Sequence, residues 1–316
     1  MNDWVITCAD ARASISAFRG VVTSWVIESE GRSRELLDGY RNEQELQSLD
    51  GYRAALMAPW SNRIEDARYS FGGKEYDLGA DPSGLREALH GLYASANFEL
   101  VGRRADSITI EAHNQGVPGY PWPTKLQATY TLREGGRLEL ELRCTNCAEQ
   151  AIKVGLGWHP YLAYQGEGEA KVDIPARTQV KVDEALIPVP GKEAFVDRNG
   201  NRQIAFEGLA GIDLAYTNLV PDPDGVVRTR LTHPDGSVTT LEGLLEGGRL
   251  GCGIVHIFTG DTLRYRPGKS FAMEPCHFMT NAFNRAEVAD EPLLQPGQTR
   301  VLRAALVHCP SYPQQD

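Results

Sequence analysis

The sequence predicts an all-β fold, on three observations. Gly (32 residues) and Pro (18 residues) recur at short intervals along the 316 residues, as in chains built from many short strands. The run 138–144, LELELRC, alternates strictly between apolar and polar residues, which is typical of a strand with one buried and one solvated face. Helical periodicity is weak throughout the chain. We therefore expect one domain over residues 1–316, with many antiparallel strands in large packed sheets.

Turn residues divide the chain into segments that read as strands. In chain order the expected strands are 107–113, 126–132, 138–144, 152–158, 170–174, 178–182, 226–232, 237–242, 254–259 and 301–308. Turns with a positive φ are expected at Gly72-Gly73, Gly135-Gly136, Asp224-Gly225 and Asp235-Gly236. The one short helix that the pattern allows is 42–49. Residues 183–218 are the least regular, and we expect long loops there over one face, where functional sites tend to lie.

Composition and charge exclude several classes of protein. An apolar share of 41% and a charged share of 23% are ordinary for a globular chain and exclude wholesale disorder. The formal net charge of −10 argues against a nucleic-acid partner or an anionic membrane surface. No apolar run approaches the roughly 18 residues of a membrane span. The start, MNDWVITCAD, lacks the features of a secretory signal, so we expect a cytoplasmic location.

The six cysteines are scattered, and two of them form a C-x-x-C at Cys144 and Cys147. A zinc half-site and a redox pair are the functional interpretations of this spacing. The sequence offers no second C-x-x-C and no H-x-x-H to complete a zinc site. The pair also ends an alternating strand instead of opening a helix, as a redox motif does. We expect strand-end thiols that bind no metal.

Familiar catalytic signatures are missing. The sequence contains no G-x-x-x-x-G-K-[ST] loop, no G-x-G-x-x-G that opens a helix, no H-E-x-x-H and no G-x-S-x-G. Nucleotide chemistry, zinc proteolysis and serine esterase chemistry are therefore disfavoured.

Four polar residues stand in apolar or aromatic surroundings: His90, His159, Asp213 and Glu274. Each alone could be a hydrogen-bonded core residue. His159 and Glu274 both precede proline, which favours an extended backbone where a strand leaves its sheet and so gives the side chain a fixed mount. A glutamate and a histidine held apart across a cleft can act as base and acid.

Sugar-binding groups are also available near these residues. Aromatic side chains on which a sugar ring could stack are Trp60, Trp122, Trp158 and Tyr161. Arg63 offers a fork of donors for neighbouring hydroxyls, and Asp213 could keep histidines in the pocket charged.

The ordered motifs resemble the aldose 1-epimerase (galactose mutarotase-like) family over nearly the whole chain. The matching segments are MAPWSNRI (57–64), YSF (69–71), YDL (76–78), LHG (89–91), GYP (119–121), YTL (130–132), WHPYL (158–162), IP (187–188), ID (212–213), FTG (258–260), MEP (273–275), NAFN (281–284) and LQPG (294–297). Two places depart from the family pattern: His256 replaces a glutamine that some members carry, and CHFMT (276–280) replaces a small or Pro-rich run.

The resemblance implies a β-supersandwich and a mutarotase that interconverts the anomers of a free aldohexose without a cofactor. It implies that Glu274 is the general base, that His159 is the general acid, and that Asn62, Arg63, His90, Tyr161 and Asp213 bind sugar hydroxyls. The expected partner is the sugar alone, and the protein a monomer or homodimer. The roles of His256 and His277 stay open.

Three alternatives use the same residues. A hexose-phosphate or sulfonated-sugar epimerase would need a basic cluster, to which Arg19, Arg53, Lys269 and Arg285 could contribute. Asp213 and Glu274 could be a glycosidase or lyase pair, with carboxylates about 5 Å apart for retention or about 6.5–9.5 Å for inversion. A sugar-binding protein on the same fold would not require the acid and base that His159 and Glu274 supply.

Overall fold

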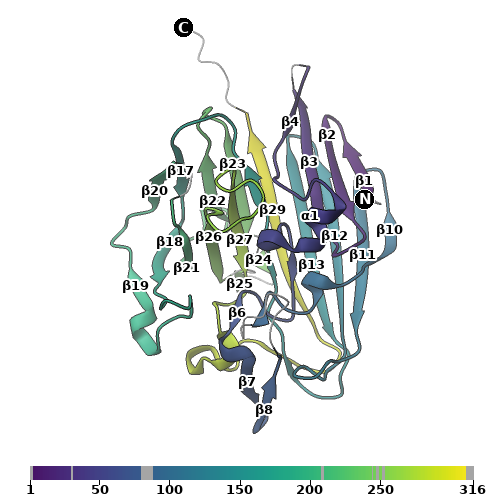
Figure 1. Cartoon of the computed structure of the whole chain (residues 1–316), viewed down its shortest axis with the longest axis vertical. Helices are drawn as coiled ribbons and strands as arrows, with labels where there is room; N and C mark the ends of the chain where they lie inside the picture. Colours follow the sequence, from purple (N-terminus) through teal and green to yellow (C-terminus); the bar gives the residue numbers. More distant parts are fainter. Residues whose placement is uncertain are drawn as a thin grey trace.

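The computed structural model describes residues 3–29, 31–79, 88–207, 210–243, 245–246, 249–250 and 253–310. Two large antiparallel sheets hold most of the strand residues (Figure 1). In order across it, the nine-stranded sheet contains β10 (Glu99–Arg103), β11 (Ser107–Asn114), β12 (Thr124–Arg133), β13 (Arg137–Asn146), β29 (Thr299–Cys309), β23 (Val238–Gly243), β22 (Val227–Thr232), β17 (Ala170–Asp173) and β20 (Gln203–Phe206).

The second sheet has eight strands and carries the residues of interest. Its order is β19 (Phe195–Asp197), β18 (Ala176–Val180), β21 (Asp213–Leu219), β26 (Ile254–Phe258), β27 (Ser270–Cys276), β15 (Gly157–Trp158) and β5 (Leu56–Met57), and β16 (Tyr161–Ala163) also pairs with β27. All seven residues of β27 are buried, so this strand is covered on both faces. Successive side chains of a strand point to opposite faces of the sheet. Val255, Ile257 and Met273 lie in the main apolar core, so the side chains between them lie on the other face.

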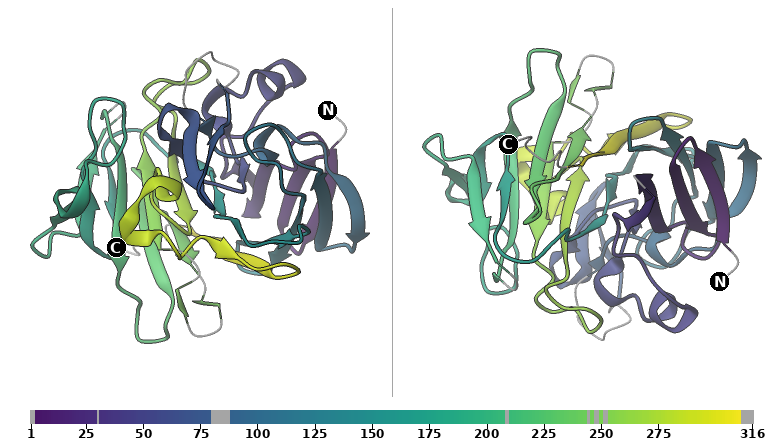
Figure 2. Two further views of the ribbon diagram at one scale, coloured as in Figure 1. Left: turned by 90° about the horizontal axis from the view of Figure 1, so that it is seen from below. Right: turned by 90° about the horizontal axis from the view of Figure 1, so that it is seen from above.

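A four-stranded sheet at the N-terminus covers one part of the nine-stranded sheet. It consists of β1 (Asp3–Cys8), β2 (Ala11–Ser16), β3 (Val22–Ser29) and β4 (Arg32–Glu35), paired in chain order. β1 and β2 contact β12, and both views in Figure 2 show these purple strands beside β10–β13. Ala13, Ile15 and Trp25 are fully buried in the same apolar core as Ile110 and Leu126.

Short elements complete the described part of the chain. Four two-stranded pairs are β6 (Arg63–Ile64) with β9 (Ala88–Leu89), β7 (Arg68–Phe71) with β8 (Lys74–Asp77), β14 (Ile152–Lys153) with β28 (Leu293–Leu294), and β24 (Leu245–Glu246) with β25 (Arg249–Leu250). The 3-10 turns are η1 (Asp50–Tyr52), η2 (Glu65–Ala67), η3 (Tyr93–Ser95), η4 (Gly191–Ala194), η5 (Ala282–Asn284) and η6 (Ala286–Val288).

The structure confirms the expected helix and turns. α1 (Glu43–Ser48) is the α-helix of the described residues; the Asn42 side chain accepts from the Glu45 amide at 2.9 Å, and Leu49 ends the helix in the left-handed region. Gly72, Gly73, Gly135, Gly136, Gly225 and Gly236 all have a positive φ. Nine of the expected strands correspond to single strands of the two large sheets, with ends shifted by one or two residues.

Three parts of the chain differ from expectation. The segment 183–218, expected to be loops, contains β19, β20 and most of β21, whose mixed polar residues hide the alternation. The expected strand 152–158 is divided between β14 and β15, because its two ends pair with different partners. Strands β1–β9 were not expected at all; their Ser, Thr and Ala residues weaken the apolar pattern that a strand prediction needs.

Candidate active site

Strand register assembles a row of four ionisable side chains on the eight-stranded sheet. Glu274 lies within β27, and the residue directly opposite it on β26 is His256. On the other side of β27, Gly157 pairs with Cys276 and Tyr161 with Ala272, which places His159 beside Glu274. Asp213 at the start of β21 lies diagonally across from His256. The order across the sheet is therefore His159, Glu274, His256, Asp213.

His159 and Glu274 are in direct contact. The distance from His159 Nε2 to Glu274 Oε1 is 3.3 Å, and both side chains are buried. The sequence-based expectation that they face each other across a cleft is therefore wrong, since neighbouring positions of adjacent strands bring them together on one side. In a closed sugar, however, the anomeric hydroxyl and the ring oxygen are bonded to the same carbon. A histidine and a glutamate in contact can therefore reach both of these oxygens at once.

The prolines act differently at the two positions. His159 lies between β15 and β16, where a strand leaves the sheet as expected, whereas Glu274 and Pro275 both lie inside β27. The Met273 and His277 amides donate toward Pro160 and Leu156. The N–H that Pro275 lacks would point the same way, toward the carbonyl of Trp158 at the end of β15, so the proline removes one hydrogen bond where that strand ends.

Asn62, Arg63 and His90 approach the row from a separate strand pair. Arg63 of β6 pairs with Leu89 of β9, the His90 amide donates to the Asn62 carbonyl at 3.0 Å, and the Asn62 amide donates to His90 Nδ1 at 3.3 Å. The Arg63 guanidinium bonds Asn62 Oδ1 at 3.3 Å. The His90 ring centroid lies 5.1 Å from that of His159.

The backbone of this strand pair is under strain. Asn62 and His90 have φ values of 56° and 59°, a strained region that is often retained at functional sites. Gly91 has a φ of 78°, and a Cβ there would lie 2.1 Å from the Ala58 carbonyl oxygen, so only glycine fits after His90.

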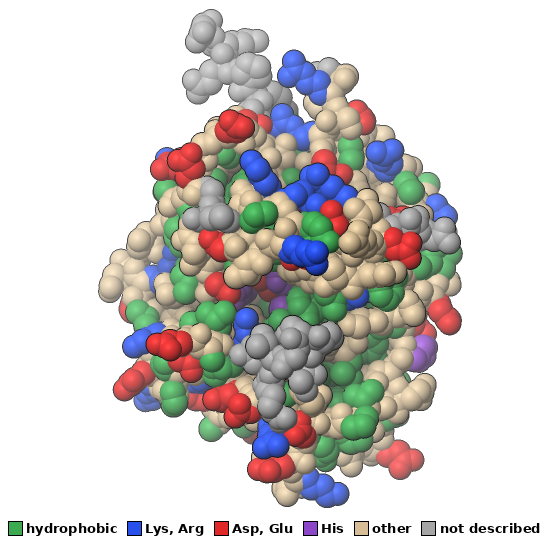
Figure 3. Space-filling model, in the orientation of Figure 1, with side chains coloured by type: hydrophobic (Ala, Val, Ile, Leu, Met, Phe, Trp, Pro, Cys, Tyr) green, Lys and Arg blue, Asp and Glu red, His purple; other side chains and the backbone are tan. Residues whose placement is uncertain are grey.

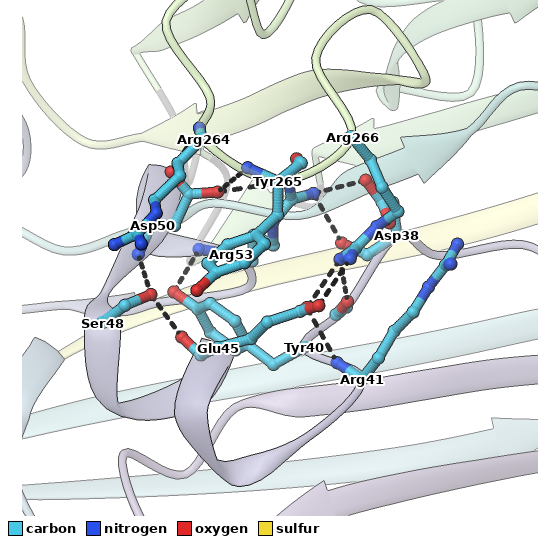
Figure 4. Close-up of polar contacts among 11 residues, drawn as sticks. Asp38, Tyr40, Arg41, Glu45, Ser48, Asp50, Arg53, Arg264, Tyr265 and Arg266 are labelled. Atoms are coloured by element: carbon cyan, nitrogen blue, oxygen red, sulfur yellow. Dashed lines mark hydrogen bonds and ion pairs between the residues drawn. The ribbon is translucent and has the colours of Figure 1, made fainter.

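Tyr161 covers His159 on one side. The two rings stack with centroids 5.0 Å apart and an interplanar angle of 10°, and the Arg53 guanidinium lies 5.2 Å from the Tyr161 ring centroid. Figure 4 shows how Arg53 is held: buried Asp38 pairs with both Arg53 and Arg266, and Arg266 also pairs with Glu45 of α1. This network joins α1, η1 and the loop after β26 behind Tyr161.

Three buried polar atoms at the centre of the site have no hydrogen-bond partner among the described residues. They are Glu274 Oε2, His159 Nδ1 and the Tyr161 hydroxyl oxygen. Buried polar atoms are normally satisfied, so their grouping here points to a polar ligand. Figure 3 shows histidine side chains within a hollow at the centre of the face seen in Figure 1.

The surroundings lower the pKa of His159 and His90 and raise the pKa of His256. Burial lowers the pKa of His159, against the pull of the Glu274 carboxylate, and burial with the His159 charge lowers the pKa of His90 further. For His256, burial alone would lower the pKa, but the Glu274 charge and the bond to Asp213 outweigh it and raise the pKa. Burial would raise the pKa of Asp213, yet the His256 hydrogen bond holds it below its usual range.

Several other expectations are corrected. Trp60, Trp122 and Trp158 are core residues with side chains packed in the main apolar cluster, so of the four aromatic side chains only Tyr161 contacts the row. Arg19 and Arg285 bond backbone carbonyls, and Arg53 pairs with Asp38; with Lys269 exposed, these four residues do not form one basic site.

His277 lies outside the row. Its Nδ1 accepts from the Leu156 amide at 3.2 Å and its Nε2 lies 3.1 Å from the Val301 carbonyl. It is a structural residue between β27 and β29.

The C-x-x-C ends its strand as expected. Cys144 is buried within β13 and Cys147 is exposed just after it. No group of three or more His, Cys, Asp or Glu side chains suited to a metal ion occurs among the residues that the structure describes. Within that same part of the chain, no helix has the length and apolar character needed to cross a membrane.

Two residues of the site carried no assigned role from the sequence. His256 was noted only as a departure from the family pattern; its alternation with Val255 and Ile257 could have placed it on the face opposite the core. Tyr52 of η1, with a ring centroid 4.7 Å from that of His90, had no sequence signal at all.

Comparisons with known proteins agree with the fold. The aldose 1-epimerase family profile matches residues 4–306, so the chain belongs to this family of isomerases. Uncharacterized protein YihR of Escherichia coli is 27% identical over 255 residues, covering 77% of this chain and 75% of its own. Galactose mutarotase of Pongo abelii is 32% identical over 171 residues, covering 52% of this chain and 48% of its own.

A solved structure shares the whole fold. The crystal structure of an aldose epimerase homologue from C. elegans matches with a TM-score of 0.83 at 17% identity, over 98% of this chain and 100% of that one. The described architecture is accordingly the galactose mutarotase fold, as the sequence resemblance implied.

Proposed function

We propose that this protein is a mutarotase that interconverts the α and β anomers of a free aldohexose. The observation that supports this most directly is the contact between His159 and Glu274 at 3.3 Å, with one polar atom of each left unpartnered and buried. An acid and a base that are adjacent can serve the two oxygens of one anomeric carbon at once. The family membership and the similarity to galactose mutarotase support the same reaction.

The proposed reaction needs two proton transfers in each direction. The Glu274 carboxylate takes the proton of the C1 hydroxyl, while protonated His159 gives its proton to the ring oxygen and the C1–O5 bond breaks. The open aldehyde rotates about C1–C2. The ring recloses from the other face as neutral His159 takes the proton back and Glu274 returns its own to the new hydroxyl. Each positioned transfer typically contributes about 10²–10⁴-fold to the rate.

The remaining side chains of the site would hold the sugar. Asn62, Arg63 and His90 lie on or next to one strained strand pair, and Tyr161 presents a buried hydroxyl that has no hydrogen-bond partner among the described residues. Asp213 already bonds His256 at 2.5 Å, so its second oxygen is the one we assign to a sugar hydroxyl. His256 lies between Asp213 and Glu274 in the row, which does not favour these two carboxylates as a glycosidase pair.

Polarimetry on freshly dissolved α-glucose and α-galactose tests the proposal, with exchange NMR as a second measurement. Acceleration over the buffer rate is the expected result. A hexose 6-phosphate serves as the third substrate, and turnover of that sugar alone would replace the free hexose by an anionic one. Binding of sugars without acceleration of any would identify a binding protein on the same fold.

A further inference from the structure

Glu274 has a histidine on each side, and the reaction proposed above uses only one of them. His159 stands on the β15–β16 side and His256 on the β26 side, each in register with Glu274. Residues directly opposite each other on antiparallel strands have Cβ atoms about 4.5–5.5 Å apart. Both imidazoles are therefore close to the same carboxylate, and both are buried.

Asp213 makes the two histidines unequal. His256 Nε2 lies 2.5 Å from Asp213 Oδ1, so the two side chains form a charge-assisted hydrogen bond. The Asp213 side chain is 30% exposed, so it can stay ionised, whereas the His256 side chain is only 10% exposed. His159 has no second carboxylate: its Nδ1 has no partner among the described residues, and its other neighbours are the rings of His90 and Tyr161.

We propose that His256 is a positioning residue for the mutarotase reaction: fixed by Asp213, it presents an imidazolium to Glu274 from the side opposite His159, and so keeps the base ionised and aligned. The proposal rests on the proposed function. Glu274 is buried to 2% exposure; His159 contacts it on one side, and His256 occupies the position opposite it on β26. Burial disfavours the charged form of a carboxylate in general, so a positive charge facing it from β26 favours the form that can act as a base.

The charges around His256 are consistent with this role. Asp213 of β21 and Glu274 of β27 favour its charged form, while Arg63 of β6 and burial oppose it, and the raised pKa of His256 shows the balance. The charge also acts on His159 and His90, whose pKa values it lowers. A lower pKa makes protonated His159 a stronger donor toward the ring oxygen.

The two histidines beside Glu274 thus have different roles. His256 holds a fixed charge, and His159 is left to exchange a proton. Glutamine at this position can donate a hydrogen bond to Asp213 but carries no charge. The substitution His256→Gln therefore removes the charge and retains a donor.

The test compares pH profiles of kcat for wild type, His256→Gln and Asp213→Asn. In the pH profile of kcat for His256→Gln, we expect the acidic limb to lie about 1–2 pH units higher than in the wild type. This is the usual size of the pKa change that one opposite charge within about 4–6 Å produces. KM should change less than kcat does at pH 6. Asp213→Asn should move the limb in the same direction, and the double variant should behave like His256→Gln, because Asp213 acts on Glu274 through the imidazolium charge of His256, which is lost in either single variant.

The matched control is His113→Gln. His113 also pairs with a glutamate, Glu111 at 2.8 Å, but it is 53% exposed and lies on β11 of the nine-stranded sheet, whereas the row lies on the eight-stranded sheet. Its profile should equal that of the wild type. An unmoved limb in His256→Gln, a loss confined to KM, or additive shifts in the double variant would each overturn the proposal.

A second readout does not depend on turnover. Nitrogen-15 NMR at pH 7.5 should show both ring nitrogens of His256 protonated in the wild type and one of them deprotonated in Asp213→Asn. A neutral His256 in the wild type contradicts the proposal even if the enzyme is active. Lack of activity with any sugar, together with a charged His256, would instead reject the proposed function alone.

Discussion

The partners of Glu274 are set by strand register and not by sequence neighbourhood. His159 comes from a distant part of the chain and His256 from the strand that precedes β27, yet register places one on each side of Glu274. A proton acceptor mounted inside a buried central strand has little freedom to move. This rigidity favours a reaction in which two protons move over short distances.

Replacing Glu274 by Gln should lower kcat by about 10²–10⁴-fold and leave KM close to the wild-type value, because the amide retains the shape but cannot accept the proton. His159→Asn should behave in the same way. Arg63→Ala should also raise KM, since Arg63 is assigned to binding the ground-state sugar. Polarimetry at several sugar concentrations separates the two effects, with the spontaneous rate as the floor. If Glu274→Gln keeps most of kcat, the base is another residue, and Asp213 becomes the first candidate.

At the residue level, the ordered motifs selected residues that the fold brings together, but they did not predict the contacts among these residues. Every residue selected from the motifs lies in or beside the row. The motifs carry no register, so the adjacency of His159 and Glu274 could not be predicted. Nor could the place of His256, because its relation to Glu274 depends on how β26 and β27 pair.

At the level of elements, a buried ionic network joins parts of the chain that the sheets do not. Arg53 follows η1, Arg266 belongs to the loop after β26, and both pair with Asp38 (Figure 4). Arg53 also donates to the Tyr265 carbonyl. The network supports the loops behind Tyr161, and hence the ring that stacks on His159.

Arg53→Met should therefore destabilise the protein by about 3 kcal/mol, since it leaves Asp38 buried with one cation fewer. The Arg53 side chain is 1% exposed and that of Asp38 is 4% exposed, so water cannot replace the lost partner. Urea unfolding measures the change. Arg68→Met is the matched control: Arg68 pairs with Asp77 at 61% and 45% exposure, and its loss should cost about 1 kcal/mol or less. Equal effects for the two variants would show that the buried network adds no stability.

The strands that could be predicted are those with one face in the core. β11, β12 and β13 alternate cleanly because a large apolar face meets each of them. β21 could not be predicted, because its start carries Asp213 toward the site and its polar residues break the pattern. The N-terminal strands have small residues at several buried positions, such as Ala11 and Ala13 in β2, which a hydrophobic pattern does not register.

For the molecule as a whole, histidines that are buried in neutral form make the free energy of unfolding depend on pH. Thr239 of β23 contacts both His233 and His308 in the nine-stranded sheet, and His277 lies between β27 and β29. Burial, with the neighbouring histidine charge, lowers the pKa of His233 to about 4. Burial, with the charge of Arg34, lowers that of His308 to about 4. Burial, with the charge of Arg300, lowers that of His277 to about 3.

These shifts predict a loss of stability in acid that begins well above the range where carboxylates titrate. In the unfolded chain each histidine binds a proton near pH 6.5, whereas in the folded chain these three stay neutral to about pH 4 or below. The unfolded state therefore binds more protons as the pH falls through 6.5, and the free energy of unfolding must fall with it.

The slope can approach about 1.4 kcal/mol per pH unit for each histidine, or about 4 kcal/mol per unit for the three between pH 6 and 4.5. His90 and His159, whose pKa values are also lowered, act in the same direction. His256 acts in the opposite direction: its raised pKa adds stability at low pH that is lost as the pH rises through the folded value. Urea titrations from pH 8 to 5 should show the decline. An unfolding free energy that stays flat between pH 7 and 5 would mean that the three buried imidazoles accept protons without unfolding, and the neutral hydrogen bonds assigned to them would then be wrong.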